Sequence, residues 1–444
     1  MTQDLIKKIR DAGVVGAGGA GFPSHVKLSA QAEVVVTNGA ECEPLLRVDQ
    51  QLMVVRAEEM VHGLELAVAV TGAKEGIIAI KGKHKEAIAT LQKAIAGKNN
   101  LRIFILDDFY PAGDEPVTLY ESTGRLVPQG GIPIAVGAVV TNTETLINIS
   151  NAEQGIPVTD TYITLCGAVP KPVTVKVPVG ITVREAFALA GVQDFANYGI
   201  IDGGPMMGGL LEDVDTPVAK TSKGYILLPK EHNLIAKRSL SMSVINRQAQ
   251  AACIQCSFCT DLCPRYLLGH HIEPHLIMRA LKYGEAAQDT LRMAFACSEC
   301  GMCEQFSCPA NISPRTVNAH LKRILAEQGI KPLDPPQDQK VNVNQTNRKV
   351  PSKRVINRIG LVAYDKAAPL EELKENYQRV TIPLKQHVGA PTKPIVSVGQ
   401  SVKRGDIVGE VPENALGAPV HASIDGIVEA ITDNGIVISQ GGVS

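Results

Sequence analysis

The segments CIQCSFCTDLCP (residues 253–264) and CSECGMCEQFSCP (residues 297–309) hold eight of the ten cysteines in this chain. In each segment three cysteines follow one another at intervals of three, and a fourth cysteine stands directly before a proline. Cys-x-x-Cys-x-x-Cys places three thiolates around one iron–sulfur cluster, and the cysteine before the proline commonly ligates the other cluster of a pair. The two segments therefore predict a domain built around two [4Fe–4S] clusters.

The crossed pattern assigns a ligand set to each cluster. The set of the first cluster is predicted to be Cys253, Cys256, Cys259 and Cys308. The set of the second is predicted to be Cys297, Cys300, Cys303 and Cys263. The second segment has one extra residue before its last cysteine. Zinc is the alternative, since tetrahedral Cys₄ sites also use Cys-x-x-Cys pairs, although three successive spacings of three fit zinc poorly.

Length and composition limit the remaining possibilities. The 444 residues suffice for about two to four domains. Lys and Arg number 44 against 45 Asp and Glu, and aromatic residues make up 4% with no Trp. We therefore expect no nucleic-acid partner, because both the positive field and the stacking side chains are missing. No run approaches the roughly 20 apolar residues of a membrane span, and no apolar targeting segment opens the chain. Clustered free thiols then predict a cytoplasmic protein.

The chain divides into regions of different character, which together predict a multi-domain α/β protein. Residues 1–150 alternate β-branched runs with helix-like stretches such as 51–70, which is typical of a mainly parallel sheet covered by helices. Residues 155–235 are richer in strands and predict a small α+β module. Residues 240–330 carry the cysteines and two helix-compatible stretches, 274–288 and 314–328. Residues 331–375 begin with a Pro-, Asn- and Lys-rich stretch that predicts an exposed linker. Residues 376–444 predict an all-β domain of short strands.

A glycine-rich segment near the N-terminus is the second strong signal. In GAGGAGFP (residues 16–23), four glycines in six residues allow positive φ and a close approach of the backbone to a ligand. Successive N–H groups in such a loop form an anion nest suited to phosphate, and Lys27 could add a charge. It is not a Walker loop, because no Gly-Lys-Ser/Thr follows. Taken alone, the segment is also compatible with a purely structural turn.

Three polar clusters accompany this loop, each directly after a predicted strand, where α/β sheets bind their ligands. They are NGAECEP (38–44), YPAGDE (110–115) and TNTET (141–145). The combination resembles the flavin-binding subunit of respiratory complex I and the C subunit of the Rnf ferredoxin–NAD oxidoreductase. The resemblance implies a Rossmann-like FMN-binding domain over residues 1–150.

The same resemblance implies the residues of the flavin site. The FMN phosphate and ribityl group would be held by Gly16, Gly18, Gly19, Gly21 and Lys27. The rest of the site would be lined by Asn38, Glu41, Asn142, Thr143 and Glu144. NADH would deliver its hydride near residues 110–115, which include Gly113 and Glu115. Those residues depart from the Gly-Glu-Glu-like run of complex I subunits, so NADH is less firmly implied than FMN.

Domain order narrows the resemblance further. Residues 155–235 look like the soluble-ligand-binding β-grasp (SLBB) domain of both families, and the paired clusters are similar to those of the Rnf C subunit. A barrel-sandwich hybrid domain stands at the N-terminus of that subunit, whereas residues 376–444 place one at the C-terminus here. In this order the chain resembles the cobalamin reductases of propanediol-utilisation microcompartments. The tail also resembles biotinyl and lipoyl domains, but its expected hairpin tip, residues 413–417, has no lysine to modify.

The resemblance implies an oxidoreductase that passes electrons from NADH through FMN and two clusters to cobalamin, reducing cob(III)alamin to cob(II)alamin and cob(I)alamin. A flavin is needed because it accepts two electrons together and releases them singly. The implied partners are a cobalamin adenosyltransferase and microcompartment shell proteins, within the cytoplasm. Two alternatives are an electron-input C subunit of an Rnf-type membrane ion pump and a non-catalytic assembly protein with zinc in the cysteine sites.

Overall fold

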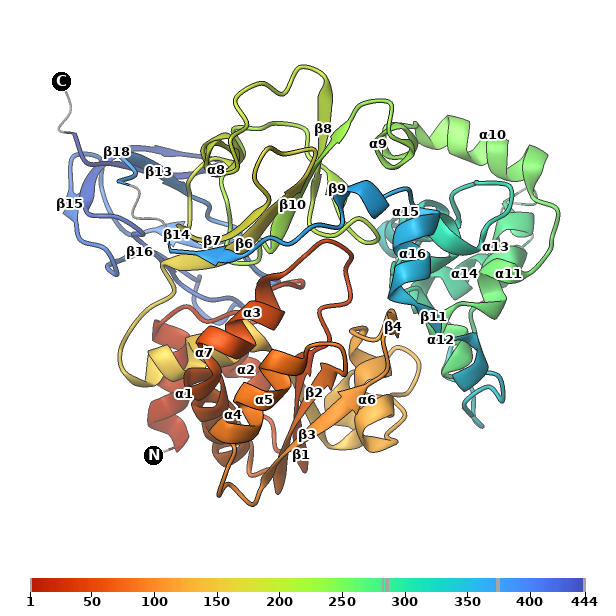
Figure 1. Cartoon of the computed structure of the whole chain (residues 1–444), viewed down its shortest axis with the longest axis horizontal. Helices are drawn as coiled ribbons and strands as arrows, with labels where there is room; N and C mark the ends of the chain where they lie inside the picture. The colour runs from red at the N-terminus through yellow and green to blue at the C-terminus, as the bar shows by residue number, and fades with distance from the viewer. Residues whose placement is uncertain (1, 282, 284–286, 373–375, 442–444) are drawn as a thin grey trace.

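The computed structural model describes residues 2–281, 283, 287–372 and 376–441. Figure 1 shows an N-terminal α/β region at the bottom, a mixed sheet above it, the cysteine-rich helices on the right and a β domain on the left. The chain passes through these regions in sequence order, except that residues 350–371 return from the cysteine-rich region to the first two.

The N-terminal region is built on a four-stranded parallel sheet, as the sequence predicted. Across the sheet, the strands are β3 (Leu101–Leu106), β2 (Glu75–Lys81), β1 (Val34–Gly39) and β5 (Ala138–Asn142). Alternate residues of these β-branched strands point to opposite faces and fill two separate cores. Both faces are therefore buried, which explains the nearly continuous apolar runs of the strands.

Helices cover both faces of this sheet. The larger core lies under α1 (Thr2–Asp11), α3 (Val48–Val55), α4 (Ala57–Thr71), α5 (Lys85–Ala94) and α7 (Thr143–Glu153). The opposite face packs on α6 (Glu115–Thr123). The single helix expected over 51–70 is two helices, because the chain breaks at Arg56, whose φ is −127°. Gly63 lets α4 approach α7, since a Cβ at that position would lie 2.0 Å from the carbonyl oxygen of Leu146.

Residues 160–229 supply five strands of a mixed six-stranded sheet, and residues 370–371 supply the sixth. Its order is β12 (Leu370–Glu371), β7 (Val173–Pro178), β6 (Asp160–Gly167), β10 (Gly224–Pro229), β8 (Tyr198–Asp202) and β9 (Gly209–Leu210). One helix, α8 (Val183–Leu189), accompanies these strands and begins with a capping box between Thr182 and Glu185. The predicted α+β module is therefore present.

The cysteine-rich region is helical. Its elements are α9 (Asn233–Arg238), α10 (Met242–Ala252), α11 (Phe258–Asp261), α12 (Pro264–Leu267), α13 (Pro274–Ala280), α14 (Gln288–Arg292), η3 (Met293–Ala296), η4 (Met302–Ser307) and α15 (Pro314–Glu327). The helix expected over 314–328 is confirmed. The one expected over 274–288 begins as α13, and residues 282 and 284–286 lie outside the described residues.

The expected linker, residues 331–375, is exposed only in its first part. Residues 331–340 are mostly exposed, but η5 (Thr346–Arg348), β11 (Val350–Pro351), α16 (Ser352–Arg358) and η6 (Val362–Tyr364) are ordered elements that follow. β11 pairs with β4 (Phe109–Tyr110), and β12 extends the mixed sheet. The polar composition of the segment predicted no buried face. The structure nevertheless buries a short apolar face with Tyr110, formed by Val350, Val355, Ile356 and Leu361. Residues 373–375 lie outside the described residues.

The C-terminal region is all-β, as expected, with two small sheets. The first contains β13 (Arg379–Ile382), β19 (Gly435–Ser439), β18 (Gly426–Thr432) and β15 (Ser401–Val402). The second contains β14 (Lys393–Pro394), β16 (Ile407–Glu410) and β17 (Val420–His421). Their inner faces share one apolar core with the mixed sheet, so this domain is packed against it. Residues 442–444 lie outside the described residues.

Candidate functional site

A cleft opens at the carboxyl ends of β1 and β5. These strands are adjacent and in register, so that Asn38 lies opposite Asn142. From β1 the sheet continues through β2 and β3 on one side and reaches β5 on the other, which makes this the position where strand order reverses and α/β sheets bind ligands. The lining residues are Gly18, Asn38, Glu41, Cys42, Glu43, Leu46, Val48, Asp49, Gly113, Asn142, Met207 and Lys223.

The glycine-rich loop lies beside the first turn of α7. The amide of Ala17 donates a 2.9 Å hydrogen bond to Thr145 Oγ1, which fixes the loop to that helix. Gly18 has φ +86°, and a Cβ there would lie 2.9 Å from the Lys223 side chain. Gly19 faces open space, whereas the carbonyl of Gly21 accepts a hydrogen bond from the amide of Val388 in the β domain.

Gly16 is the base of the loop rather than part of the cleft. Its amide donates a 3.0 Å hydrogen bond to the carbonyl of Phe22 and closes the turn. The loop is therefore structural at its ends and approaches the cleft only through Gly18. Of the four glycines that the sequence analysis assigned to the flavin phosphate, Gly18 is the one that lines the cleft.

Asn38 organises the floor of the cleft. Its Nδ2 donates a 2.8 Å hydrogen bond to the carbonyl of Gly113, and its Oδ1 accepts from the amide of Ala40 at 3.3 Å. Gly113 has no room for a side chain, because a Cβ would lie 2.9 Å from Cys42 Sγ. These contacts hold the 38–44 and 110–115 segments together, as the sequence predicted from their positions after β1 and β3.

Glu41 caps α3 from the cleft. Its carboxylate accepts hydrogen bonds from the amides of Asp49 at 2.7 Å and Gln50 at 3.1 Å, at the end of the helix where anions are favoured. Burial, reinforced by the nearby carboxylate of Asp49, raises the pKa of Glu41 to about 7. Glu41 is therefore protonated more readily than an exposed carboxylate.

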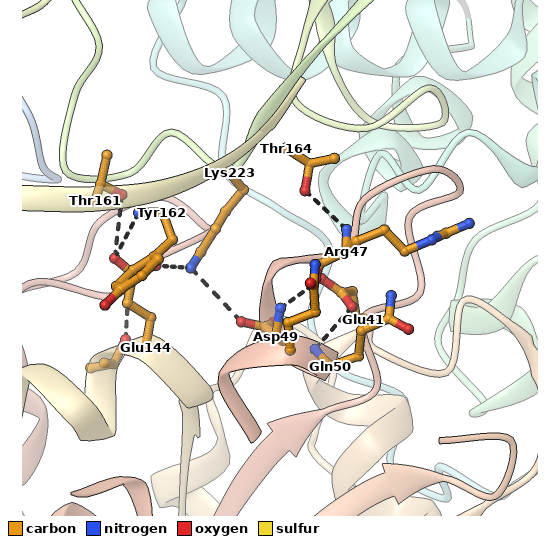
Figure 2. A network of polar contacts seen from close by, with 12 residues as sticks. Glu41, Arg47, Asp49, Gln50, Glu144, Thr161, Tyr162, Thr164 and Lys223 are labelled. Atoms are coloured by element: carbon orange, nitrogen blue, oxygen red, sulfur yellow. Dashed lines mark hydrogen bonds and ion pairs between the residues drawn. The ribbon is translucent and has the colours of Figure 1, made fainter. Parts of the chain in front are cut away.

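A buried charge network forms the opposite wall (Figure 2). Lys223, which immediately precedes β10, extends down between α7 and α3 and pairs with Glu144. It also lies 3.8 Å from Asp49 Oδ1. The Glu144 side chain is 2% exposed and that of Lys223 is 11% exposed. Burial alone would lower the pKa of Lys223, but Glu144 and Asp49 raise it above the usual value. The ammonium is therefore charged and crosses from one domain into the site of another.

Lys27 and Glu115 lie outside the lining of the cleft. Lys27 Nζ is 3.2 Å from Glu115 Oε1 and donates a 2.8 Å hydrogen bond to the carbonyl of Val140. The pair belongs to a neighbouring, largely apolar hollow that Phe22 and Ile132 help to line. Of the predicted flavin residues, five line the cleft and two line this neighbouring hollow. Those of the cleft are Gly18, Asn38, Glu41, Gly113 and Asn142, and those of the hollow are Lys27 and Glu115.

Thr143 is buried at the first turn of α7, next to the cleft. Its Oγ1 has no hydrogen-bond partner among the described residues, and Asn142, which precedes the helix, makes no side-chain cap. A buried hydroxyl without a partner is costly unless something else satisfies it. The helix terminus can therefore accept polar atoms of a bound anion.

Sequence reasoning missed the contributions of Glu43, Asp49, Met207 and Lys223 to this site. Glu43 stands in the 38–44 segment, so its position after a strand could have identified it. Asp49, Met207 and Lys223 come from a helix and from another domain, and no local pattern marks them. Met207 and Lys223 enter the site because the mixed sheet is placed over the first domain, where α3 supplies Asp49.

Glu43 and Tyr110 connect the cleft to the cysteine-rich region. The hydroxyl of Tyr110 lies 2.9 Å from Glu43 Oε1 and 2.6 Å from the carbonyl oxygen of Cys300. Glu43 Oε2 accepts a hydrogen bond from the amide of Met206 at 3.0 Å. Arg265, just after Cys263, pairs with Asp114 at 2.9 Å. Two of the cysteines in the predicted second set are thereby fixed against the wall of the cleft.

The first predicted cysteine set surrounds a single hollow. Cys253, Cys256, Cys259 and Cys308 all line it, together with Pro309. Burial raises the pKa of Cys259 to about 12, with Cys256 and Cys308 contributing in the same direction. This proximity agrees with the crossed assignment, in which the last cysteine of the second segment joins the first three of the other.

The second predicted set is more deeply buried. Burial raises the pKa of Cys303, and the adjacent Cys297, Cys300 and Cys263 raise it further. Burial also raises the pKa of Cys300, and the next largest contribution is from Cys263. These four thiols therefore lie together, although Cys263 belongs to the other segment.

Both cysteine segments have the same backbone. Gln255 and Ser257 have φ of 55° and 62°, and Glu299 and Gly301, at the matching positions, have 58° and 75°. The left-handed residues curl each loop so that its thiols converge. The extra residue in the second segment is absorbed by η4, a π-helical turn where the first segment has the α-helical turn α11.

Among the described residues, no group of three or more His, Cys, Asp or Glu side chains is arranged to hold a single metal ion. In the same part of the chain, no helix combines the length and apolar character needed to cross a membrane.

Family models match three parts of the chain. Residues 9–151 match the Nuo51 FMN-binding domain, residues 252–313 a 4Fe-4S dicluster domain, and residues 363–442 the RnfC barrel sandwich hybrid domain. These matches confirm the predicted order along the chain of an FMN-binding region, a dicluster region and a barrel-sandwich region, within a mixed α/β protein. The exact domain bounds stay predictions.

Individual proteins match over different lengths. The C subunit of the Na(+)-translocating ferredoxin:NAD(+) oxidoreductase complex of Acetobacterium woodii is 37% identical over 60% of this chain and 59% of its own. A solved NAD+-reducing [NiFe]-hydrogenase in the H2-reduced state superimposes with a TM-score of 0.50 at 19% identity, over 76% of this chain and 64% of that one. That likeness concerns the fold alone.

Two relatives match from end to end. The proteins named cobalamin reductase PduS from Citrobacter freundii and Salmonella typhimurium are 47% and 46% identical, each over 99% of this chain and 97% of its own length. The chain therefore belongs to the PduS cobalamin reductase family.

Proposed function

We propose that this chain is an NADH-dependent cobalamin reductase, in which FMN and two [4Fe–4S] clusters connect the nicotinamide donor to the cobalt of cobalamin. The overall reaction takes cob(III)alamin through cob(II)alamin to cob(I)alamin and uses both electrons of one hydride. The observation that carries the proposal is the end-to-end match to proteins of this name, over a chain in which Tyr110 joins the cleft to one of the two cysteine sets.

The cleft supports the flavin assignment. When bound, FMN supplies the conversion between two-electron and one-electron chemistry. Gly18, the free turn of α7 and the Thr143 hydroxyl would receive the phosphate-bearing part, and Lys223 would hold a positive charge at the wall. Asn38 and Gly113 fix the floor. The parallel sheet with its site at the strand-order reversal supports a Rossmann-like domain.

Lys27 and Glu115 would act from the adjoining hollow. Their apolar surroundings and their position along β5 suit a group that must lie flat beside the cleft. We assign this hollow to the nicotinamide donor, with Glu115 accepting hydrogen bonds from it and Lys27 holding the Glu115 carboxylate in place through their ion pair. The assignment extends the expectation that NADH approaches near residues 110–115.

The cysteine sets support a two-cluster relay with a defined order. Cys300 is joined to the cleft through Tyr110, so the set of Cys263, Cys297, Cys300 and Cys303 is the inner one. The set of Cys253, Cys256, Cys259 and Cys308 is the outer one, next to the exposed side chains of Ile254 and Phe258. Electrons would leave the protein at this outer face, where cobalamin would be reduced.

The remaining domains would hold the relay together. The mixed sheet, which we assign to the SLBB β-grasp type, delivers Lys223 and Met207 to the cleft. The C-terminal domain packs against that sheet and the glycine-rich loop, and residues 413–417 provide no lysine for a cofactor arm. A cobalamin adenosyltransferase and shell proteins of a cytoplasmic microcompartment are the partners that this function requires.

Anaerobic purification followed by iron, sulfide and flavin analysis tests the cofactor assignment. We expect about eight iron atoms and one FMN per chain, from two four-iron clusters and one flavin site. NADH should then bleach the absorbance of added aquacobalamin, with ferricyanide as a control acceptor. Reduction of ferricyanide but not of cobalamin would overturn the proposal. Recovery of the protein with integral membrane subunits would favour the Rnf-type alternative.

A further inference from the structure

A second cavity lies away from the cleft and the cysteines, where three domains meet. Its volume is about 240 Å³. The first domain contributes Arg56 and one face of α7, the mixed sheet contributes Tyr162 and Lys176, and the β domain contributes Arg404. The proposed electron relay uses none of these residues.

The cavity has an excess of positive charge. Arg56, Lys176 and Arg404 all line it, and Asp160 is the one carboxylate among the described lining residues. That carboxylate is shared, because Asp160 pairs with Arg404 and also lies 3.6 Å from Lys176 Nζ. Two cations thus compete for one anion, and a second anion in the cavity would relieve the imbalance.

Arg56 is held in position from two sides. Its Nε contacts Glu59 at 2.7 Å, and its Nη1 donates a 3.1 Å hydrogen bond to the Tyr162 hydroxyl. These two contacts orient the guanidinium before any ligand arrives, and the Arg56 side chain is still 24% exposed. Preorganised guanidinium groups match the oxygens of a phosphate group better than a mobile ammonium does.

The rest of the lining limits the size and character of a ligand. Ile147, Ile156 and Val158 provide an apolar wall beside the cations. The volume is slightly below the roughly 300–1,000 Å³ of sites for drug-sized molecules. It suits a compact molecule with one phosphate and a short carbon chain, and it is too small for a dinucleotide or for cobalamin.

We propose that this cavity binds a small phosphate ester, whose phosphate is held by Arg56, Lys176 and Arg404 and whose carbon chain lies against Ile147 and Ile156. Because the three cations come from three domains, the bound ligand connects the flavin-binding domain to the mixed sheet and to the β domain. Binding then stabilises the docking of these domains by mass action.

Isothermal titration calorimetry of the cofactor-loaded protein, with inorganic phosphate and glycerol 3-phosphate as probes, tests this site. We expect saturable binding of both, tighter for the ester, and a rise in the melting temperature that chloride at equal ionic strength does not produce. Lys176→Gln should weaken binding about tenfold or more, since it removes one charge-assisted contact. The Lys176 side chain is 41% exposed, so this variant should fold normally.

Arg184→Gln is the matched control. Arg184 lies in the same domain and pairs with Asp215 at 2.7 Å, outside the cavity. The Arg184→Gln protein should bind phosphate and glycerol 3-phosphate as tightly as the wild-type protein does. Absence of saturable binding, equal weakening in the control variant, or tighter binding of propionate than of phosphate would each overturn the proposal.

Discussion

Lys223 decides, at the scale of single residues, whether the buried carboxylates beside the cleft can be tolerated. Glu144 and Asp49 are both removed from water, and burial raises the pKa of each. The ammonium of Lys223, which comes from the mixed-sheet domain, compensates the negative charge of both carboxylates. Since breaking a buried pair leaves an uncompensated charge, the network links the folding of the site to the docking of the mixed sheet.

Replacing Lys223 with Met should therefore lower the free energy of unfolding by about 3–5 kcal/mol, the usual cost of leaving a buried charge unpaired. Adding Glu144→Gln should recover part of the loss, because the neutral amide needs no counter-charge. Urea unfolding of the anaerobic protein, followed by circular dichroism, measures both. Lys171→Met, at an exposed pair with Glu371, should cost no more than about 1 kcal/mol. Equal effects at the two lysines would contradict this account.

The cysteines allow a test of the crossed ligand sets. Cys263→Ser should disrupt the inner cluster and leave the outer one, although Cys263 belongs to the first segment. Cys308→Ser should do the opposite. Iron content together with the electron paramagnetic resonance spectra of the reduced proteins distinguishes the two outcomes. Loss of the cluster belonging to the mutated residue's own segment would show that each segment ligates its own cluster.

The residues of the site were predictable to the extent that they follow strands. Asn38, Glu41, Gly113 and Asn142 belong to segments noted for their positions after predicted strands, and the resemblance to flavin-binding subunits singled them out. All of them line the cleft. Lys27 and Glu115 were expected with them but pair with each other in the neighbouring hollow. Spacing along the chain indicates which edge of the sheet a residue reaches, whereas the direction of its side chain depends on tertiary packing.

At the scale of elements, the contact between α4 and α7 positions one side of the cleft. α7 carries Thr143 and Glu144 at its first turn, and α4 supports it from behind. Gly63 is required because the carbonyl oxygen of Leu146 occupies the space that a side chain would need. In an isolated helix, Gly63→Ala would be favourable by about 1 kcal/mol.

In this protein we expect the opposite result from Gly63→Ala. The clash should force α7 away, lower the melting temperature by several degrees and reduce the FMN content of the purified protein, since overpacking typically costs about 1–3 kcal/mol. Glu58→Ala, on the exposed face of the same helix, is the control and should retain wild-type FMN content. A more stable Gly63→Ala protein would mean that the two helices separate without consequence.

The elements also show where sequence patterns fail. The parallel sheet, the helical cysteine region and the β tail were predicted because their periodicity or cysteine spacing is strong. The segment 350–371 was expected to belong to a linker, because residues 331–358 are rich in Pro, Asn, Gln and basic side chains. It is ordered because β11 and β12 each add to a strand from another region. Pairing between segments so distant in the chain leaves no local signal.

At the scale of the whole molecule, the two ends of the chain are held together by buried polar groups. Lys220 Nζ donates hydrogen bonds to the carbonyls of Gly13 at 2.9 Å and Pro419 at 2.8 Å. His421 Nε2 lies 2.9 Å from the carbonyl oxygen of Asp11. These contacts attach the β domain to the flavin-binding domain close to the glycine-rich loop, so their protonation affects how the molecule is assembled.

His421 should make this assembly sensitive to acid. Burial, assisted by the positive charge of Lys220, lowers the pKa of His421 from 6.5 to about 3. Between these pH values the unfolded chain binds a proton at His421 that the folded protein does not bind. The contribution of neutral His421 to the free energy of unfolding is therefore fully present above about pH 6.5 and decreases as the pH falls. One such group contributes about 1.4 kcal/mol per pH unit.

His421→Gln should therefore flatten the decrease in melting temperature between pH 6.5 and pH 4.5, measured on anaerobic protein. His62→Gln, at a half-exposed site on α4, should leave the wild-type slope unchanged. Parallel pH profiles for the wild-type and His421→Gln proteins would mean that His421 is protonated in the folded state and that acid weakens the molecule elsewhere.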